Sequence, residues 1–82
     1  AYGSGSGSST NLSMGSSGTD VKNMQKKLIA LGYSCGSSGA DGIFGQGTYN
    51  AVCKFQKANG LSVDGIIGPA TRAKINALYA KL

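Results

Sequence analysis

One short pattern occurs twice in this chain and constrains its fold more than any other feature. Residues Asp41-Gly-Ile-Phe-Gly45 match Asp64-Gly-Ile-Ile-Gly68 at a constant offset of 23 residues. Asp-Gly is typical of a turn, because Asp accepts backbone N–H bonds two residues on and Gly tolerates positive φ. A stretch with helical spacing of apolar residues follows each copy. The sequence therefore predicts two repeated D-G-I-x-G loop-helix units.

A proline marks where the second of these helices begins. Pro69 favours the first helical position, where a missing N–H costs nothing, so Gly68 is the expected N-cap. By the repeat, Gly45 caps the preceding helix, and Phe44 with Tyr49 would form a hydrophobic staple across its start. The residues assigned to the structural repeat are Asp41, Gly42, Thr48, Asp64, Gly65, Gly68, Pro69 and Thr71.

Apolar periodicity predicts three helices, at about residues 19–31, 46–59 and 69–80. Gly32 and Gly60 would end the first two. The predicted fold class is all-α, a small three-helix bundle with two long ordered loops. The side chains expected to face the core are Val21, Met24, Leu28, Leu31, Ala51, Val52, Phe55, Ile75 and Leu78, with Thr71 and Leu82 near the same face.

The start of the chain differs from the rest in composition, because it is rich in Gly and Ser. We expect residues 1–10 to be a flexible linker or an expression remnant, since they cannot bury enough surface to offset their ordering entropy. Residues 11–82 would form one small domain with a marginal core. No apolar run approaches the roughly 20 residues of a membrane span, and no secretory signal is visible. We expect an excised module or a mature protein, attached to something else and not inserted in a membrane.

The charge and the residue inventory argue against two functional classes. The net charge is +5, but the Lys and Arg residues are spread over all three helices without aromatic interleaving, so we expect no nucleic-acid partner. The chain has no His and no Glu, and therefore lacks the usual general bases and metal ligands. Asp41 and Asp64 occupy equivalent turns and are expected to be structural. We predict no catalytic residue, no metal and no cofactor.

The chain has two cysteines, Cys35 and Cys53, which leaves a disulfide or two free thiols as the alternatives. No C-x-x-C spacing is present, and two thiols without His or Glu partners do not make a zinc site. The loop that carries Cys35 has to pass the second helix, which carries Cys53. Because closing such a loop would stabilise a small domain by about 3 kcal/mol, we expect the disulfide and an extracellular setting.

Several motifs in fixed order make this chain resemble the peptidoglycan-binding domain family (PGBD-like), whose members are accessory modules of bacterial cell-wall hydrolases. The matching stretches are residues 15–28, 31–33, 41–48, 51–56 and 59–71. The resemblance implies a monomeric three-helix domain without catalysis of its own. Its partners would be peptidoglycan and a covalently linked amidase, peptidase or lytic enzyme, at the bacterial cell wall or the spore. The alternative function is a structural or protein-docking module that contacts its own catalytic domain.

The candidate ligand site lies at the start of the second helix. Early N–H groups of a helix lack intrahelical partners and favour negative charge, and stem peptides carry carboxylates. Tyr residues would stack on sugar faces, Asn and Gln would bond hydroxyls and amides, and Arg would pair a carboxylate. The alternative is that Phe44 and Tyr49 only staple the helix and that Arg72 is solvated. The predicted ligand-binding residues are Tyr33, Phe44, Gly45, Gln46, Tyr49, Asn50 and Arg72.

Overall fold

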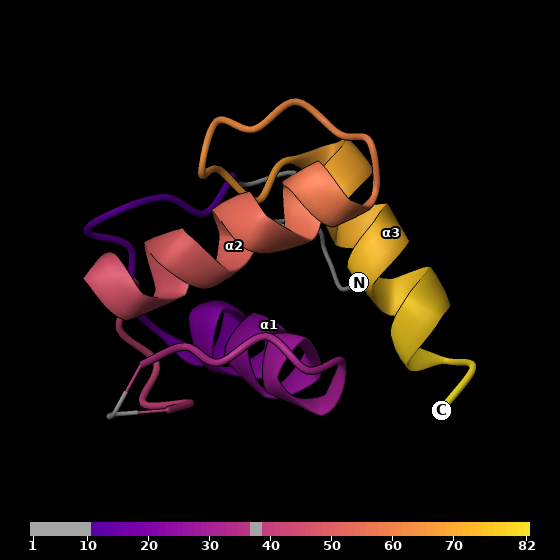
Figure 1. The fold of residues 1–82 in the computed structure, drawn as a ribbon. Helices are drawn as coiled ribbons and strands as arrows, with labels where there is room; N and C mark the ends of the chain where they lie inside the picture. Colours follow the sequence, from indigo (N-terminus) through magenta and orange to yellow (C-terminus); the bar gives the residue numbers. More distant parts are fainter. Residues whose placement is uncertain (1–10, 37–38) are drawn as a thin grey trace.

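The protein is described by a computed structural model that covers residues 11–36 and 39–82, so the expected linker lies outside the described residues. Three helices are the regular elements of this part: α1 (Thr19–Ala30), α2 (Gln46–Ala58) and α3 (Pro69–Tyr79). Helix α1 packs against both α2 and α3, and Figure 1 shows a long loop arching from the end of α2 back to the start of α3. The predicted all-α bundle is confirmed, and each helix ends one residue earlier than predicted.

Glycines precede all three helices. Gly18, Gly45 and Gly68 are the N-caps of α1, α2 and α3, and none of them supplies a side-chain acceptor to the first helical turn. Pro69 opens α3 at its first position, as expected from its preset φ. The early N–H groups of each helix are therefore not satisfied by a capping side chain. None of the helices in the described ranges is long and apolar enough to cross a bilayer.

The segment before α1 connects the two repeated loops. Leu12 and Ile67 exchange two backbone hydrogen bonds, with N···O distances of 3.0 and 2.8 Å. Phe44 N–H donates to Ser16 at 2.8 Å, and Gly15 N–H donates to Phe44 at 3.0 Å. Since Phe44 and Ile67 are equivalent positions of the repeat, one extended segment holds both loops next to the core.

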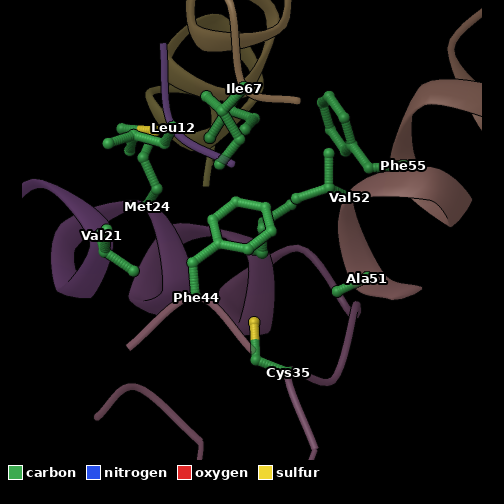
Figure 2. Packing of buried hydrophobic residues seen from close by; sticks show 11 residues of the cluster. Leu12, Val21, Met24, Cys35, Phe44, Ala51, Val52, Phe55 and Ile67 are labelled. Carbon is green, nitrogen blue, oxygen red and sulfur yellow. The ribbon is translucent and has the colours of Figure 1, made fainter. Parts of the chain in front are cut away.

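The core lies where α1, α2 and the two loops meet. Figure 2 shows the Phe44 ring among side chains from α1, from α2 and from the segments before α1 and α3. Ile75 is the α3 side chain in this cluster, and Leu78 is half-buried against it. The expectation for Leu82 is wrong: its side chain is 74% exposed, because α3 ends at Tyr79 and no longer directs it inward. The buried apolar residues are Leu12, Val21, Met24, Leu28, Cys35, Phe44, Ala51, Val52, Phe55, Ile67 and Ile75.

The structure corrects the expected disulfide, because Cys35 and Cys53 are both free thiols. Cys35 is buried, its sulfur points toward the core in Figure 2, and its thiol donates to the Gln25 carbonyl at 3.9 Å. Cys53 instead lies beside Tyr49, which precedes it by one turn of α2. Thr48 and Cys53 are about 140° apart around the axis of α2, so the two sulfurs face different sides of that helix.

Candidate functional site

Two open clefts lie at the starts of α2 and α3. The first has a volume of about 290 Å³ and the second a volume of about 520 Å³. The first is lined by Asp41, Ile43, Gly45, Gln46, Gly47 and Thr48, and the second by the equivalent Asp64, Ile66, Gly68, Pro69, Ala70 and Thr71. The repeat in the sequence thus appears as two equivalent clefts. Their further lining residues differ: Cys35 and Gly36 in the first, and Asn11, Gly60, Leu61 and Ser62 in the second.

A single buried amide on α1 fixes the loop at the first cleft. The Gln25 side chain is 0% exposed, and its Oε1 accepts the Gly42 N–H at 2.8 Å. Its Nε2 lies 2.7 Å from the Thr48 hydroxyl, 2.9 Å from the Ile43 carbonyl and 3.3 Å from Asp41 Oδ1. The amide therefore joins the turn, the chain after it and the first turn of α2.

The equivalent amide on α2 fixes the loop at the second cleft. Gln56 is 1% exposed, and its Oε1 accepts the N–H groups of Asp64 and Gly65 at 3.1 and 3.0 Å. Its Nε2 lies 2.8 Å from Asp64 Oδ1, 2.9 Å from the Ile66 carbonyl and 3.2 Å from the Thr71 hydroxyl. Helix α1 thus positions the cleft at the start of α2, and helix α2 positions the cleft at the start of α3.

The two aspartates of the repeat brace their own turns. Asp41 Oδ1 accepts the Ile43 N–H, and Asp64 Oδ1 accepts the Ile66 N–H, each at 2.9 Å. The Ile66 N–H and the Gln56 amide, which bond the ionised form, lower the pKa of Asp64. Gly42 and Gly65 have φ values of 83° and 72°, the left-handed region that favours glycine. This is the turn chemistry expected from the sequence.

At the first cleft the loop backbone packs closely against α2, and among the described residues the second cleft has no equivalent contact. A Cβ placed on Gly47 would collide with the Cys35 carbonyl oxygen, so the loop backbone rests directly on the first turn of α2. The position equivalent to Gly47 in α3 is Ala70, which already carries a Cβ. The burial of Cys35 raises the pKa of its thiol, an effect that its hydrogen bond with Thr48 opposes. This close packing accompanies the smaller volume of the first cleft.

The structure brings together only some of the predicted ligand-binding residues. Gly45 and Gln46 line the first cleft, and the exposed Asn50 accepts a hydrogen bond from Gln46 Nε2 at 3.0 Å. Phe44 is a correction: it is 1% exposed and packs in the core, so it offers no surface to a ligand.

The two predicted tyrosines have packing roles. The Tyr33 ring meets the Phe55 ring edge-on, with centroids 5.4 Å apart. The Tyr49 ring lies directly on Gly65, where a Cβ would collide with it. The nearby Cys53 raises the pKa of the Tyr49 hydroxyl. Tyr33, Tyr49 and Arg72 are half-buried and are not among the residues lining either cleft.

Gln25 and Gln56 are the positioning residues that the repeat analysis missed. A second repeat contains the signal: Val21, Met24, Gln25 and Lys26 match Val52, Phe55, Gln56 and Lys57 at an offset of 31 residues. The shared pattern is V-x-x-[MF]-Q-K. A polar residue recurring at the same place on two apolar helix faces would have indicated a buried amide with a structural role.

The charge of both clefts disfavours an acidic ligand. Each lining contains one Asp and no Lys or Arg. Early N–H groups of the following helix, hydroxyls and amides supply the hydrogen bonds. Within residues 11–36 and 39–82, no three His, Cys, Asp or Glu side chains gather where they could hold a metal. Three helices with an open cleft at the start of α2 and another at the start of α3 define a small all-α domain.

Comparison with known proteins identifies the family. Residues 17–75 match the model of the peptidoglycan binding domain. The chain is 49% identical over 72 residues to the N-acetylmuramoyl-L-alanine amidase CwlL of Bacillus licheniformis, covering 88% of this chain and 20% of that protein. It is 43% identical over 61 residues to a spore cortex-lytic enzyme of Bacillus cereus, covering 74% of this chain and 23% of that protein. The chain belongs to the peptidoglycan binding domain family, as the resemblance implied.

Solved structures agree with this assignment. A peptidoglycan-binding protein from Clostridioides difficile, in complex with glutamine hydroxamate, superposes with a TM-score of 0.80 at 49% identity, covering 87% of this chain and 43% of that one. The SleB N-terminal domain superposes with a TM-score of 0.82 at 38% identity, covering 88% of this chain and 96% of that one. The chain spans only about a fifth of the length of the first curated relatives that it matches.

Proposed function

We propose that this chain is a non-catalytic module that binds peptidoglycan and holds a linked wall hydrolase on its substrate. The observation that carries the proposal is the pair of equivalent clefts at the starts of α2 and α3 in a chain of this family. The related amidase and cortex-lytic enzyme are several times longer than the matched region. The catalysis in their names is therefore not transferred to this chain, and its place of action is the bacterial cell wall or spore.

The first cleft supplies contacts suited to the amides and hydroxyls of peptidoglycan. Gln46 and Asn50 form a hydrogen-bonded amide pair at its edge, and Gly45 leaves the start of α2 open because no side chain covers it. Asp41 in the same lining disfavours a carboxylate, so the neutral parts of the polymer fit better than its acidic groups. Outside the clefts, Tyr33, Tyr49 and Arg72 remain candidate contacts for a longer ligand, because all three are partly exposed.

Cosedimentation with purified, insoluble peptidoglycan sacculi tests this function. We expect the wild-type chain to sediment with the sacculi and the double variant Gln46→Ala, Asn50→Ala to bind at least about fivefold more weakly. Tyr33→Ala and Arg72→Ala test the contacts outside the clefts in the same assay. Lys54→Ala is the control, because it changes an exposed residue of α2 that lines neither cleft.

Two results would overturn the proposal. One is a wild-type chain that stays in the supernatant at every sacculus concentration. The other is a chain that binds its linked hydrolase domain but not the sacculi, which would establish the docking function instead. Both assays have to be done on protein whose circular dichroism shows the helical fold, so that loss of binding is not loss of structure.

A further inference from the structure

Two threonines at equivalent positions of the repeat differ in their hydrogen bonds. The Thr48 hydroxyl accepts from Gln25 Nε2 at 2.7 Å and lies beside the buried Cys35 thiol, whose pKa it lowers. The Thr71 hydroxyl accepts from Gln56 Nε2 at 3.2 Å, and within the described part of the chain it meets no acceptor for its own proton. Thr71 is only 5% exposed. A buried donor without an acceptor costs free energy, which a ligand at this position would recover.

The Gln56 amide has too few hydrogens to bond all three of its acceptors, so the Thr71 oxygen keeps capacity to accept a further hydrogen bond. An amide nitrogen carries two hydrogens, and three acceptors surround Nε2 of Gln56. The shorter contacts, at 2.8 and 2.9 Å, go to Asp64 Oδ1 and the Ile66 carbonyl. At the first cleft the order is reversed, since Thr48 holds the shortest contact and Asp41 the longest. Thr71 can therefore both donate to and accept from a molecule in the second cleft.

The walls of the second cleft combine apolar and uncharged polar groups. Leu61, Ile66, Pro69 and Ala70 supply apolar surface, and Ser62 adds a hydroxyl. The Asn11 amide lies across the start of α3: its Oδ1 and Nδ2 are 3.6 and 4.0 Å from the place where a Cβ on Gly68 would be. The volume of about 520 Å³ falls within the range of small-molecule sites, roughly 300 to 1,000 Å³, whereas the first cleft, at about 290 Å³, lies at the lower limit of that range.

This combination matches an N-acetylated amino sugar. A pyranose ring and an acetamido methyl offer apolar surface to Leu61 and Pro69, and the acetamido carbonyl accepts a proton from a buried hydroxyl. The acetamido N–H needs an acceptor, which the Asn11 amide and the Asp64 carboxylate provide. An acidic ligand would be repelled by Asp64, since no Lys or Arg lines the cleft.

We propose that the second cleft is the subsite for an acetamido sugar of the glycan strand, with Thr71 as the donor to the acetamido carbonyl. The inference rests on the proposed function, because it names which part of peptidoglycan is bound and where. It also gives the two clefts different tasks. The first cleft contacts other neutral groups of the polymer, and the second selects N-acetylated sugar units.

Titration with a β-1,4-linked N-acetylglucosamine tetramer, followed by amide chemical shifts, tests the subsite. We expect the largest shift changes at Leu61, Ser62 and Thr71. Thr71→Val keeps the volume of the side chain and removes the hydroxyl, so it should weaken binding of the tetramer at least about fivefold. Thr19→Val is the matched control: it makes the same change at an exposed residue of α1 outside both clefts.

A second variant keeps the test valid if Thr71→Val affects folding. Asn11 is exposed and no hydrogen bond of its side chain is present in the described structure, so Asn11→Ala should fold normally and still weaken binding of the tetramer. The subsite is wrong if wild-type protein binds sacculi and neither variant changes the affinity for sacculi or tetramer; the proposed function then stands. The sugar assignment is wrong if Thr71→Val weakens sacculus binding while the tetramer shifts no residue of the second cleft. Failure of wild-type protein to bind sacculi would instead overturn the proposed function.

Discussion

The side chain of Gln56 repeats, around the loop at residues 64–66, the hydrogen bonds that Gln25 makes around the loop at residues 41–43. Each amide accepts a backbone N–H from the glycine of the turn and donates to the carbonyl of the following isoleucine. Helix α1 therefore holds the loop before α2, and helix α2 holds the loop before α3. The shape of each cleft therefore depends on one buried amide, Gln25 for the first cleft and Gln56 for the second. Neither glutamine lines the cleft that it shapes.

Replacing either amide should destabilise the fold strongly. Gln25→Ala and Gln56→Ala each leave buried N–H and C=O groups without partners and create a small cavity, so we expect the free energy of unfolding to fall by about 2–4 kcal/mol. Urea denaturation measures the loss. The exposed Gln46→Ala should change stability by no more than about 0.5 kcal/mol. Wild-type stability in both buried variants would show that the amides do not hold the loops.

The helices and their N-caps could be predicted because their signals are local. Pro69 and the glycines at 45 and 68 fix the starts of α2 and α3 within a few residues of sequence. The buried amides could not be placed the same way, since a glutamine within a helix has no local signature. The partners of Gln25 lie 16 to 23 residues away. Only the second repeat, at an offset of 31 residues, carries the signal.

The candidate site was predicted in part, for a similar reason. Gly45 and Gln46 line a cleft because they belong to the repeat itself. The second cleft was not predicted as a ligand site, because no local pattern indicates that Asn11 and Leu61 line a larger cleft at the start of α3. The cysteines show a further limit. Sequence spacing does not tell which way a side chain points, and Cys35 and Cys53 face different sides of α2.

Gly47 in α2 should not tolerate alanine. In an open helix position Gly→Ala would stabilise by about 1 kcal/mol, because alanine has the better helix propensity. Here the added methyl would collide with the Cys35 carbonyl, so we expect a net loss of about 2 kcal/mol and movement of the loop that walls the first cleft. Thermal or urea unfolding measures it. Gly45→Ala, where nothing lies within 4 Å of the new methyl, should cost less than about 1 kcal/mol. A stabilised Gly47→Ala variant would contradict the close packing.

The two free thiols should differ in reactivity. Iodoacetamide should alkylate the partly exposed Cys53 first, because Cys35 is buried and its pKa is raised by that burial. Mass spectrometry of the folded protein should show one fast addition, which Cys53→Ala removes, and a second addition only on unfolding. Protein purified under oxidising conditions should have the same intact mass with and without reductant. A mass lower by two hydrogens, with no alkylation, would establish the disulfide.

Asp64 should make stability depend on pH in the acid range. Its pKa is lowered in the folded state by the Ile66 N–H and the Gln56 amide, so it lies below the unfolded value of about 3.9. Ionisation then favours the folded state above about pH 4, and the gain is lost as the pH falls through the folded pKa. Asp64→Asn keeps an oxygen acceptor and removes the charge. We expect wild-type protein to be the more stable at neutral pH and the difference to shrink as the pH falls through the folded-state pKa of Asp64.

Urea denaturation of both proteins across this pH range measures that difference. Asp20→Asn removes the same charge from an exposed position in the first turn of α1, so it reports the general effect of raising the net charge. A larger pH dependence for Asp64→Asn than for Asp20→Asn would then reflect the hydrogen bonds that the Asp64 carboxylate accepts, since the Asp20 change reports only net charge and the helix dipole. A pH-independent difference between wild type and Asp64→Asn would mean that the Ile66 N–H and the Gln56 amide do not select the ionised carboxylate. The turn at the second cleft would then be held mainly by the Gln56 amide, through the N–H groups of residues 64 and 65 and the Ile66 carbonyl.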